Sequence, residues 1–338
     1  MIDIPGLNYR TQRYKESYDQ LPQNLILGSE TASTVSSRGV YKFPVEDKKS
    51  TKYEDHQCSS YDVEACSWSN IPDEDFALAD DNHWTIGQFV WTGFDYLGEP
   101  SPYDTDAWPN HSSMFGIIDL ASLPKDRYYL YRSVWNKDAE PCIFCLTGHG
   151  REREGEVTPI FVYTNYPTAE LFINGKSYGK QSKNNSSLKN RYRLMWMDAV
   201  YEPGEVKVVA YNKDGKAVAE KVVRTAGKPH HIELVSNRNE LTADGKDLAY
   251  VTVKVVDKDG NLCPTDNRQI NFSAKGAGKY RAAANGDPTN LEQFHLPKMH
   301  AFNGMLTAII QAGETAGEIV FTAKANGVKA GNIRIQTK

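Results

Sequence analysis

Apolar residues follow two different patterns along this chain of 338 residues. Before about residue 138 the apolar runs are short and unbroken, as at 25–27 and 89–91. Unbroken runs of this kind are typical of strands buried on both faces, as in a parallel sheet covered by helices. From about residue 139 onward the runs alternate with polar residues, which is typical of strands with one solvated face. The pattern therefore predicts a change of fold class near residue 139.

The unbroken runs predict strands at 24–30 and 85–91, with the tail of an earlier strand at 4–9. Helices are predicted between and after them, beginning near Arg13, Pro72 and Pro124, because a proline is well accommodated in the first turn of a helix. Residues 33–80 contain few periodic runs before the second of these helices. A loop of that length inside a compact domain is usually functional or disordered.

Polar side chains follow the predicted strands at the points where they end. The first strand ends at Glu30, and the second runs into Trp91 and a segment that contains Asp95 and Glu99. In a closed α/β barrel, chemistry is carried at the C-terminal ends of the strands. Glu30 is therefore a candidate catalytic carboxylate, although a glutamate at this place could also cap the following helix or be simply solvated. Aromatic and acidic residues together at a strand end suit a pocket for a sugar.

The alternating region predicts two all-β sandwiches, at residues 139–226 and 227–338, because short strands recur with turn signals between them. Asn174-Gly175 is a strong hairpin signal, since both residues tolerate positive φ. Neither sandwich contains an evident catalytic constellation. The stretch 285–290 is interpreted as turn chemistry.

Composition and charge exclude several classes of function. The net charge of −4 offers no basic surface for a nucleic acid, and no apolar run approaches the length of a membrane span. No signal peptide is expected, because Met1 is followed directly by a polar, proline-containing segment. Cys142 and Cys145 form a C-x-x-C, but no second pair or histidine cluster accompanies them, so we interpret them as two thiols on a strand. We expect no metal and no cofactor.

Three motifs occur in a fixed order in the first part of the chain: NLILGSETAS, GQFVWTGFDYLGEP and FGIIDLASLPKDRYYLYRSVW. In this order they resemble the last part of the catalytic barrel of glycoside hydrolase family 2, in particular of its β-galactosidase-like members. The later stretches VYTNYPTAELFINGKSYGK and LTADGKDLAYVTVKVVDKDG resemble the immunoglobulin-like domains that follow this barrel. The resemblance implies a multidomain chain: the last strands of a (β/α)8 TIM barrel at 1–138, then two immunoglobulin-like sandwiches at 139–226 and 227–338.

The resemblance also implies a retaining β-glycosidase and roles for individual residues. Glu30 matches the nucleophile at the end of barrel strand seven, and Tyr9 matches the strand-six tyrosine that hydrogen-bonds it. Trp91 matches the aromatic residue that floors the sugar site. Asp95 and Glu99 either line the pocket or support its loop. The stretches that resemble the family also contain four residues to which we assign no role: Asn8, Arg38, Tyr61 and Asp62.

One carboxylate required by the family pattern is not found. Retaining glycosidases use a nucleophile and an acid/base about 5 Å apart, and the family's acid/base lies on strand four, which precedes the strands found here. We therefore expect the C-terminal portion of a β-galactosidase-like enzyme, inactive alone. An alternative is a half that regains activity with a separately encoded N-terminal half. Another is a non-catalytic carbohydrate-binding or adhesive protein. The expected substrate is a β-galactoside-type glycan, and the parent enzyme is expected in the periplasm or outside the cell.

Overall fold

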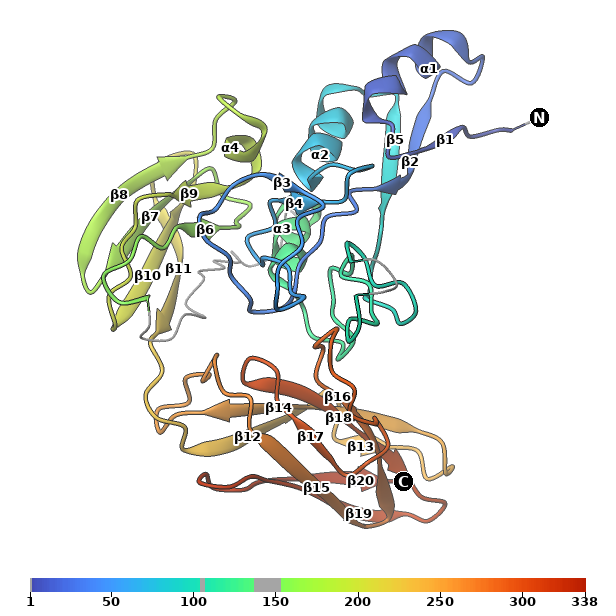
Figure 1. Ribbon diagram of the computed structural model, residues 1–338, viewed down its shortest axis with the longest axis vertical. Helices are drawn as coiled ribbons and strands as arrows, with labels where there is room; N and C mark the ends of the chain where they lie inside the picture. Colours follow the sequence, from blue (N-terminus) through green and yellow to red (C-terminus); the bar gives the residue numbers. More distant parts are fainter. Residues whose placement is uncertain (1, 104–106, 137–152) are drawn as a thin grey trace. The chain divides into compact units, whose positions relative to one another are not determined.

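The computed structural model describes residues 2–103, 107–136 and 153–338. These residues divide into two compact units, shown as ribbons in Figure 1. The first contains the described residues up to 118, from 124 to 136 and from 153 to 223, and the second contains 119–123 and 224–338. The predicted change of fold class at 138–139, and Cys142 and Cys145, lie outside the described residues.

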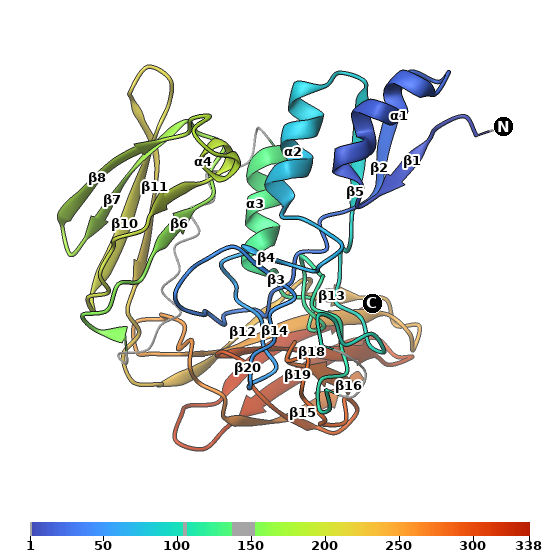
Figure 2. The same ribbon diagram turned by 45° about the horizontal axis from the view of Figure 1, so that its top comes forward.

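The first unit begins with a three-stranded parallel sheet in the order β1-β2-β5 (Figures 1 and 2). Its strands are β1 (Gly6–Asn8), β2 (Ile26–Thr31) and β5 (Thr85–Val90). They coincide with the three predicted strands to within a few residues. In register, Asn8 lies opposite Glu30, and Thr31 lies opposite Val90. The C-terminal ends of all three strands therefore meet at one edge of the sheet.

Helices connect these strands, as the sequence predicts. They are η1 (Thr11–Arg13), α1 (Tyr14–Gln20), α2 (Pro72–Asp81) and α3 (Asp126–Trp135). Tyr14 of α1 is buried in a cluster with Ile26 and Trp84, which attaches α1 to the sheet. Phe76 of α2 contacts Tyr131 of α3 with 5.1 Å between ring centroids, so these two helices lie side by side. Pro72 occupies the first turn of α2, where its missing N–H is no loss.

The prediction that residues 85–91 form a strand buried on both faces is wrong for the described chain. Ile86 and Phe89 of β5 are 50% and 65% exposed. The strand is one edge of the three-stranded sheet, and only β2 pairs with it among the described residues. An unbroken apolar run shows that a strand could be buried on both faces. The described residues cover only part of the apolar surface of β5.

The long segment between β2 and α2 is an ordered, largely buried part of the first unit. All of residues 31–38 and 57–66 are buried. A short parallel pair, β3 (Lys48–Lys49) and β4 (Glu64–Ala65), gives this segment its only strands. Many of its buried polar groups have partners, for example the Ser33 N–H, which donates to Ser69 Oγ at 2.8 Å. The segment is therefore built as a packed loop rather than as a disordered one.

The remainder of the first unit is a smaller β-structure. One sheet has the order β11-β10-β7-β8, and a separate pair joins β6 and β9. Leu171, Val208 and Trp196 lie in its core. The predicted hairpin at Asn174-Gly175 joins β7 to β8, with φ angles of 48° and 80°. The elements are β6 (Ile160–Val162), β7 (Thr168–Ile173), β8 (Lys176–Ser182), α4 (Leu188–Tyr192), β9 (Leu194–Trp196), β10 (Glu205–Tyr211) and β11 (Ala217–Arg224).

Buried charges attach this β-structure to α2. Arg193, which follows α4, donates through Nε to Asp73 Oδ1 at 3.0 Å and through a terminal nitrogen to Asp73 Oδ2. Its other terminal nitrogen donates to the carbonyls of Asp62 at 3.1 Å and Tyr61 at 3.3 Å. The side chains of Arg193, Asp73 and Asp62 are all completely buried. At the exposed rim, Arg191 pairs with Asp81.

The second unit consists mainly of two antiparallel-rich sheets that share one core. Their orders are β12-β14-β18-β16 and β13-β20-β19-β15-β17. Val253 of the first sheet and Phe321 of the second are completely buried in the same cluster. The strands are β12 (His231–Ser236), β13 (Glu240–Leu241), β14 (Leu248–Val256), β15 (Gln269–Gly276), β16 (Gly278–Ala284), β17 (Lys298–His300), β18 (Met305–Ala312), β19 (Gly317–Lys324) and β20 (Gly331–Thr337).

Candidate active site

The ends of the three parallel strands bring Tyr9, Glu30 and Trp91 to the same edge of the sheet. The Tyr9 N–H donates to the Glu30 carbonyl at 3.0 Å, and the Trp91 N–H donates to the Thr31 carbonyl at 2.8 Å. The side chains of Tyr9 and Glu30 are also neighbours, because burial and then the Glu30 carboxylate raise the pKa of the Tyr9 hydroxyl. Glu30 is only partly buried, so its carboxylate is held by neighbours and still reaches solvent.

The environment of Tyr9 keeps its hydroxyl protonated. Burial raises the pKa of the Tyr9 hydroxyl well above its ordinary value, the nearby Ser33 side chain lowers it somewhat, and the Glu30 carboxylate raises it again. A protonated phenol is able to donate a hydrogen bond to a carboxylate. Tyr9 therefore offers a donor beside Glu30, and such a donor would favour the ionised carboxylate.

Backbone strain is concentrated beside Glu30. Tyr9 and Ala32 have φ angles of 53° and 46°, in the left-handed region that residues with a Cβ seldom adopt. Such a conformation costs on the order of 1–2 kcal/mol for each residue and persists only where the surrounding structure enforces it. Ala32 is completely buried, and Tyr9 is held through its N–H. Strain on both sides of one carboxylate marks this strand end as a functional position.

Tyr96 is a site residue that the sequence interpretation missed. Its hydroxyl donates to Glu99. The rings of Trp91 and Tyr96 meet edge to face with 6.0 Å between centroids. Burial, followed by the Glu99 carboxylate, raises the pKa of Tyr96, and Glu30 contributes as well, which places Tyr96 within electrostatic range of Glu30. The only signal in the sequence is its place between Asp95 and Glu99.

Of the two open alternatives for Asp95, the structure favours support of the loop. Its side chain is 3% exposed, and its Oδ2 forms an ion pair with Lys125 at 2.7 Å. Its Oδ1 accepts a hydrogen bond from the Gly116 N–H at 2.8 Å. Glu99 is different, because it is exposed and its recorded partner is the Tyr96 hydroxyl. Glu99 therefore belongs with the aromatic residues of the site, whereas Asp95 holds the loop from within.

The four residues left without a role are distributed over the same unit. Asn8 accepts a hydrogen bond from Ser29 Oγ at 2.6 Å, beside the strand end that carries Tyr9. Tyr61 is completely buried and donates to the carbonyl of Pro159 at 2.9 Å. Asp62 is completely buried near Arg127 and Arg193. Arg38 is buried as well. Tyr61 and Asp62 thus contribute to the buried framework of the first unit rather than to its surface.

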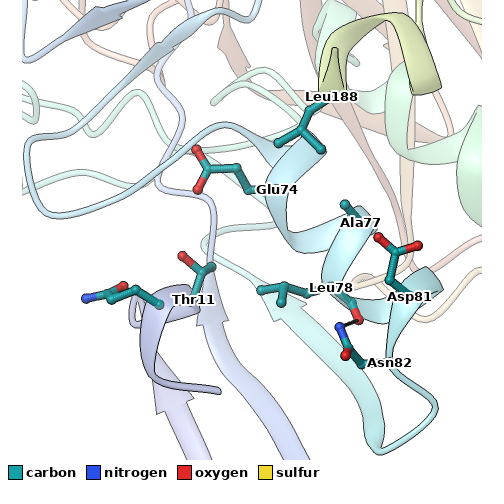
Figure 3. A pocket seen from close by; sticks show the side chains of 8 residues that line it. Thr11, Glu74, Ala77, Leu78, Asp81, Asn82 and Leu188 are labelled. Atoms are coloured by element: carbon teal, nitrogen blue, oxygen red, sulfur yellow. Dashed lines mark hydrogen bonds between the residues drawn. The ribbon is translucent and has the colours of Figure 1, made fainter. Parts of the chain in front are cut away.

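A surface hollow of about 330 Å³ lies on the helical side of the sheet (Figure 3). It is bordered by η1, α2 and α4, with Glu74 and Leu78 on α2 and Leu188 on α4. It shares no lining residue with the Glu30 site. Within residues 2–103, 107–136 and 153–338, no helix is long and apolar enough to cross a membrane, and no group of three or more acidic, histidine or cysteine side chains is arranged to hold a metal ion.

Comparison with known proteins identifies the family. The description "Glycoside hydrolase family 2 C-terminal domain 5" matches residues 232–334, and a domain of unknown function, DUF4982, matches residues 155–219. A beta-galactosidase of Bacteroides ovatus, BoGH2A, is 38% identical over 347 aligned positions that cover 100% of this chain and 39% of that enzyme. The chain belongs to glycoside hydrolase family 2.

Other relatives agree with this placement. A putative beta-glucuronidase of Formosa agariphila is 34% identical over 62% of this chain and 20% of its own length. The crystal structure of a beta-glycosidase from Bacteroides vulgatus superimposes with a TM-score of 0.86 and 26% identity, covering 99% of this chain and 45% of that one. This family 2 chain thus spans 39% of BoGH2A and 45% of the Bacteroides vulgatus structure, and it matches their C-terminal parts.

Proposed function

We propose that this chain supplies the nucleophile side of the active site of a retaining β-glycosidase, in particular a β-galactosidase that hydrolyses terminal β-glycosidic bonds. Glu30 is the nucleophile, Tyr9 orients its carboxylate, and Trp91 packs against the sugar. The observation that carries the proposal is the position of Tyr9 beside Glu30 where two adjacent parallel strands end, with the Tyr9 N–H donating to the Glu30 carbonyl at 3.0 Å. The strained backbone of Tyr9 and Ala32 at the same place supports it.

The proposed chemistry needs a second carboxyl group. A Glu30 oxygen attacks the anomeric carbon while the bond to the leaving oxygen breaks and an acid protonates that oxygen; water, deprotonated by the same group, then releases the sugar. In our proposal the three parallel strands are the last strands of a (β/α)8 barrel at residues 1–138, followed by immunoglobulin-like domains at 139–226 and 227–338. The acid/base comes from barrel residues outside this 338-residue sequence, so the chain alone is inactive.

The proposed substrate is a β-galactoside-type glycan. The name of the Bacteroides ovatus relative, which aligns with the whole chain, supports galactose over glucuronic acid. The proposed partners are this carbohydrate and the remaining, N-terminal half of the barrel. The proposed location of the enzyme is the periplasm or the cell exterior.

The test uses the enzyme that contains this chain together with the rest of the barrel. Replacing Glu30 with glutamine keeps its size and removes the attacking charge, so turnover of an aryl β-galactoside should fall on the order of 10⁴-fold, equivalent to about 5 kcal/mol. A 2-deoxy-2-fluoro galactoside should label Glu30 in the native enzyme, as detected by peptide mass spectrometry. The 338-residue chain alone should show neither turnover nor label.

Variants of a second carboxylate and a rescue experiment test whether Glu30 itself is the nucleophile. Glu99→Gln changes an exposed carboxylate of the same site and should leave a substantial part of the activity. In a separate experiment, added azide should restore turnover by Glu30→Ala and release a glycosyl azide of inverted configuration. Retention of full turnover by Glu30→Gln, or a label on Asp95 or Glu99, would show that the assignment of Glu30 is wrong. Turnover of an aryl β-glucuronide in preference to the galactoside would overturn the proposed sugar.

A further inference from the structure

Trp68 is an exposed tryptophan on a turn that is hydrogen-bonded to the segment after Glu30. The Cys66 N–H donates to the Ser33 carbonyl at 3.0 Å, and the Ser33 N–H donates to Ser69 Oγ at 2.8 Å. Trp68 lies between these two attachment points. Its neighbours Cys66 and Ser69 are 0% and 4% exposed, whereas Trp68 is 47% exposed. This turn therefore holds a large aromatic ring exposed to solvent. The turn is distant from Glu30 in the chain, but it is hydrogen-bonded directly to the segment that follows Glu30.

A row of aromatic rings connects Trp68 to the Glu30 site. The centroid of Trp68 lies 6.5 Å from that of Phe115, and Phe115 lies 6.3 Å from Tyr96. Tyr96 in turn meets Trp91 at 6.0 Å. Phe115 is 1% exposed and forms the buried middle of the row, so Trp68 and Trp91 are two accessible aromatic surfaces on one apolar base.

Polar residues flank the exposed ring in the chain. Ser67 is exposed beside it, and its N–H is held by Ser50 Oγ at 2.9 Å. On the other side, Ser69 Oγ accepts the hydrogen bond from the Ser33 N–H at 2.8 Å. An aromatic face with hydrogen-bonding groups at its rim suits a pyranose ring, which has an apolar C–H face and polar hydroxyls at its edge.

We propose that Trp68 binds a second sugar unit of the substrate, adjacent to the unit that Glu30 attacks. The proposal rests on the proposed function, because it assigns the sugar next to that site. The row of rings continuous with Trp91 is the argument for a carbohydrate rather than a protein as the occupant. Trp68 thereby raises kcat/KM for oligosaccharides relative to simple glycosides.

The test compares two substrates in the enzyme that contains this chain. Trp68→Ala should lower kcat/KM for a β-galactosyl disaccharide or trisaccharide about tenfold, since loss of one aromatic packing surface is worth about one factor of ten. The kcat/KM for methyl β-galactoside, which has no second sugar, should change by less than about twofold. Trp68→Phe should recover most of the loss, because it keeps an aromatic face.

Trp135→Ala provides the control for removal of an exposed tryptophan. Trp135 is 51% exposed at the end of α3 and should not alter the ratio of the two kcat/KM values. Equal losses on both substrates, or a lower melting temperature with an unchanged ratio, would mean that Trp68 serves folding or is covered by another part of the enzyme. No change on either substrate would show that it does not contact the sugar.

Failure of the proposed function is distinguishable from failure of this inference. The Kd of the oligosaccharide is measured calorimetrically in the Glu30→Gln background, with and without Trp68→Ala. If Glu30→Gln still hydrolyses the sugar, the proposed function fails, whatever Trp68 does. If Glu30→Gln is inactive and the added Trp68→Ala leaves the Kd unchanged, only the assignment of Trp68 fails.

Discussion

Replacing Arg193 with methionine is expected to destabilise the first unit strongly. The guanidinium donates to both carboxylate oxygens of Asp73 and to the carbonyls of Tyr61 and Asp62. Methionine is of similar length and carries no charge, so the variant leaves the carboxylate of Asp73 and two carbonyl groups buried without this donor. The carboxylate of Asp62, which lies 3.9 Å from Arg193, also loses one of its two cationic neighbours.

The magnitude follows from burial. Removing one partner of a completely buried ion pair costs about 3–5 kcal/mol, chiefly because the remaining charge is left unpaired. We expect about 4 kcal/mol for Arg193→Met at neutral pH. The double variant Arg193→Met with Asp73→Leu removes both charges and should recover a large part of this loss, since apolar replacements of a buried pair are often close to neutral.

Arg191→Met is the matched control two residues away. Its pair with Asp81 is similar in length, at 2.8 Å, but the two side chains are 24% and 58% exposed. Solvent screening limits an exposed pair of this kind to less than about 1 kcal/mol. The two variants thus remove the same type of side chain from the same connection, and they differ in burial and in the carbonyl hydrogen bonds that Arg193 makes to Tyr61 and Asp62.

Tryptophan fluorescence during urea unfolding reports the first unit selectively. All tryptophans of the chain lie within it: Trp68, Trp84, Trp91, Trp108, Trp135 and Trp196. With a urea dependence of about 2–3 kcal/mol/M, a loss of 4 kcal/mol moves the midpoint by roughly 1.3–2 M. A shift for Arg193→Met no larger than that for Arg191→Met would refute the argument from burial.

Two other predictions concern stability. Burial, partly offset by a hydrogen bond from Asn70, raises the pKa of Asp75 from 3.8 to about 7. Between these two pH values the folded state holds a proton that the unfolded state has lost. The resulting contribution to the free energy of unfolding is complete below about pH 4, and up to about 4 kcal/mol of it is lost as the pH rises to about 7. Asp75→Asn should flatten this fall in urea midpoints measured from pH 4.5 to 8, and parallel curves for the two proteins would contradict it. Gly116→Ala would place a Cβ 2.2 Å from the Asp95 nitrogen and 2.4 Å from the Ile118 carbonyl oxygen, and should cost about 3 kcal/mol; an unchanged melting temperature would show that the loop yields.

Strands with regular alternation could be predicted from the sequence closely. Residues 248–256 form β14, and their alternating β-branched residues with a turn at Gly260 are the pattern from which such a strand is predicted. The strands β16 and β17 lack this pattern, since the first contains glycine, arginine and alanines and the second is only three residues long. Both are held by pairing with β18 and β15, a tertiary effect that local sequence does not record.

The candidate site could be predicted in part. Glu30 follows an apolar run that stops abruptly, and the resemblance added Tyr9 and Trp91. Tyr96 was missed, because a tyrosine at a strand end carries no distinct pattern. The buried charges were missed for a more general reason: a charged residue in a sequence is expected at the surface unless its partner is known. The partners of Arg193 are 120 to 132 residues away in the chain.

The buried charges form one continuous set of contacts between the first unit's β-structure and its strand ends. Arg193 binds Asp73 and lies 3.9 Å from Asp62, and Asp62 lies 3.5 Å from Arg127. Arg127 donates to the carbonyl of Thr34, in the segment after Glu30, and to the carbonyl of Phe115, which also accepts from the N–H that follows Trp91. Loss of any partner in this set leaves a charge buried without its counter-ion. The same connected ion pairs therefore stabilise both the attachment of the β-structure and the segment that follows Glu30. Arg193→Met should therefore loosen both together rather than release an intact β-structure from an intact sheet.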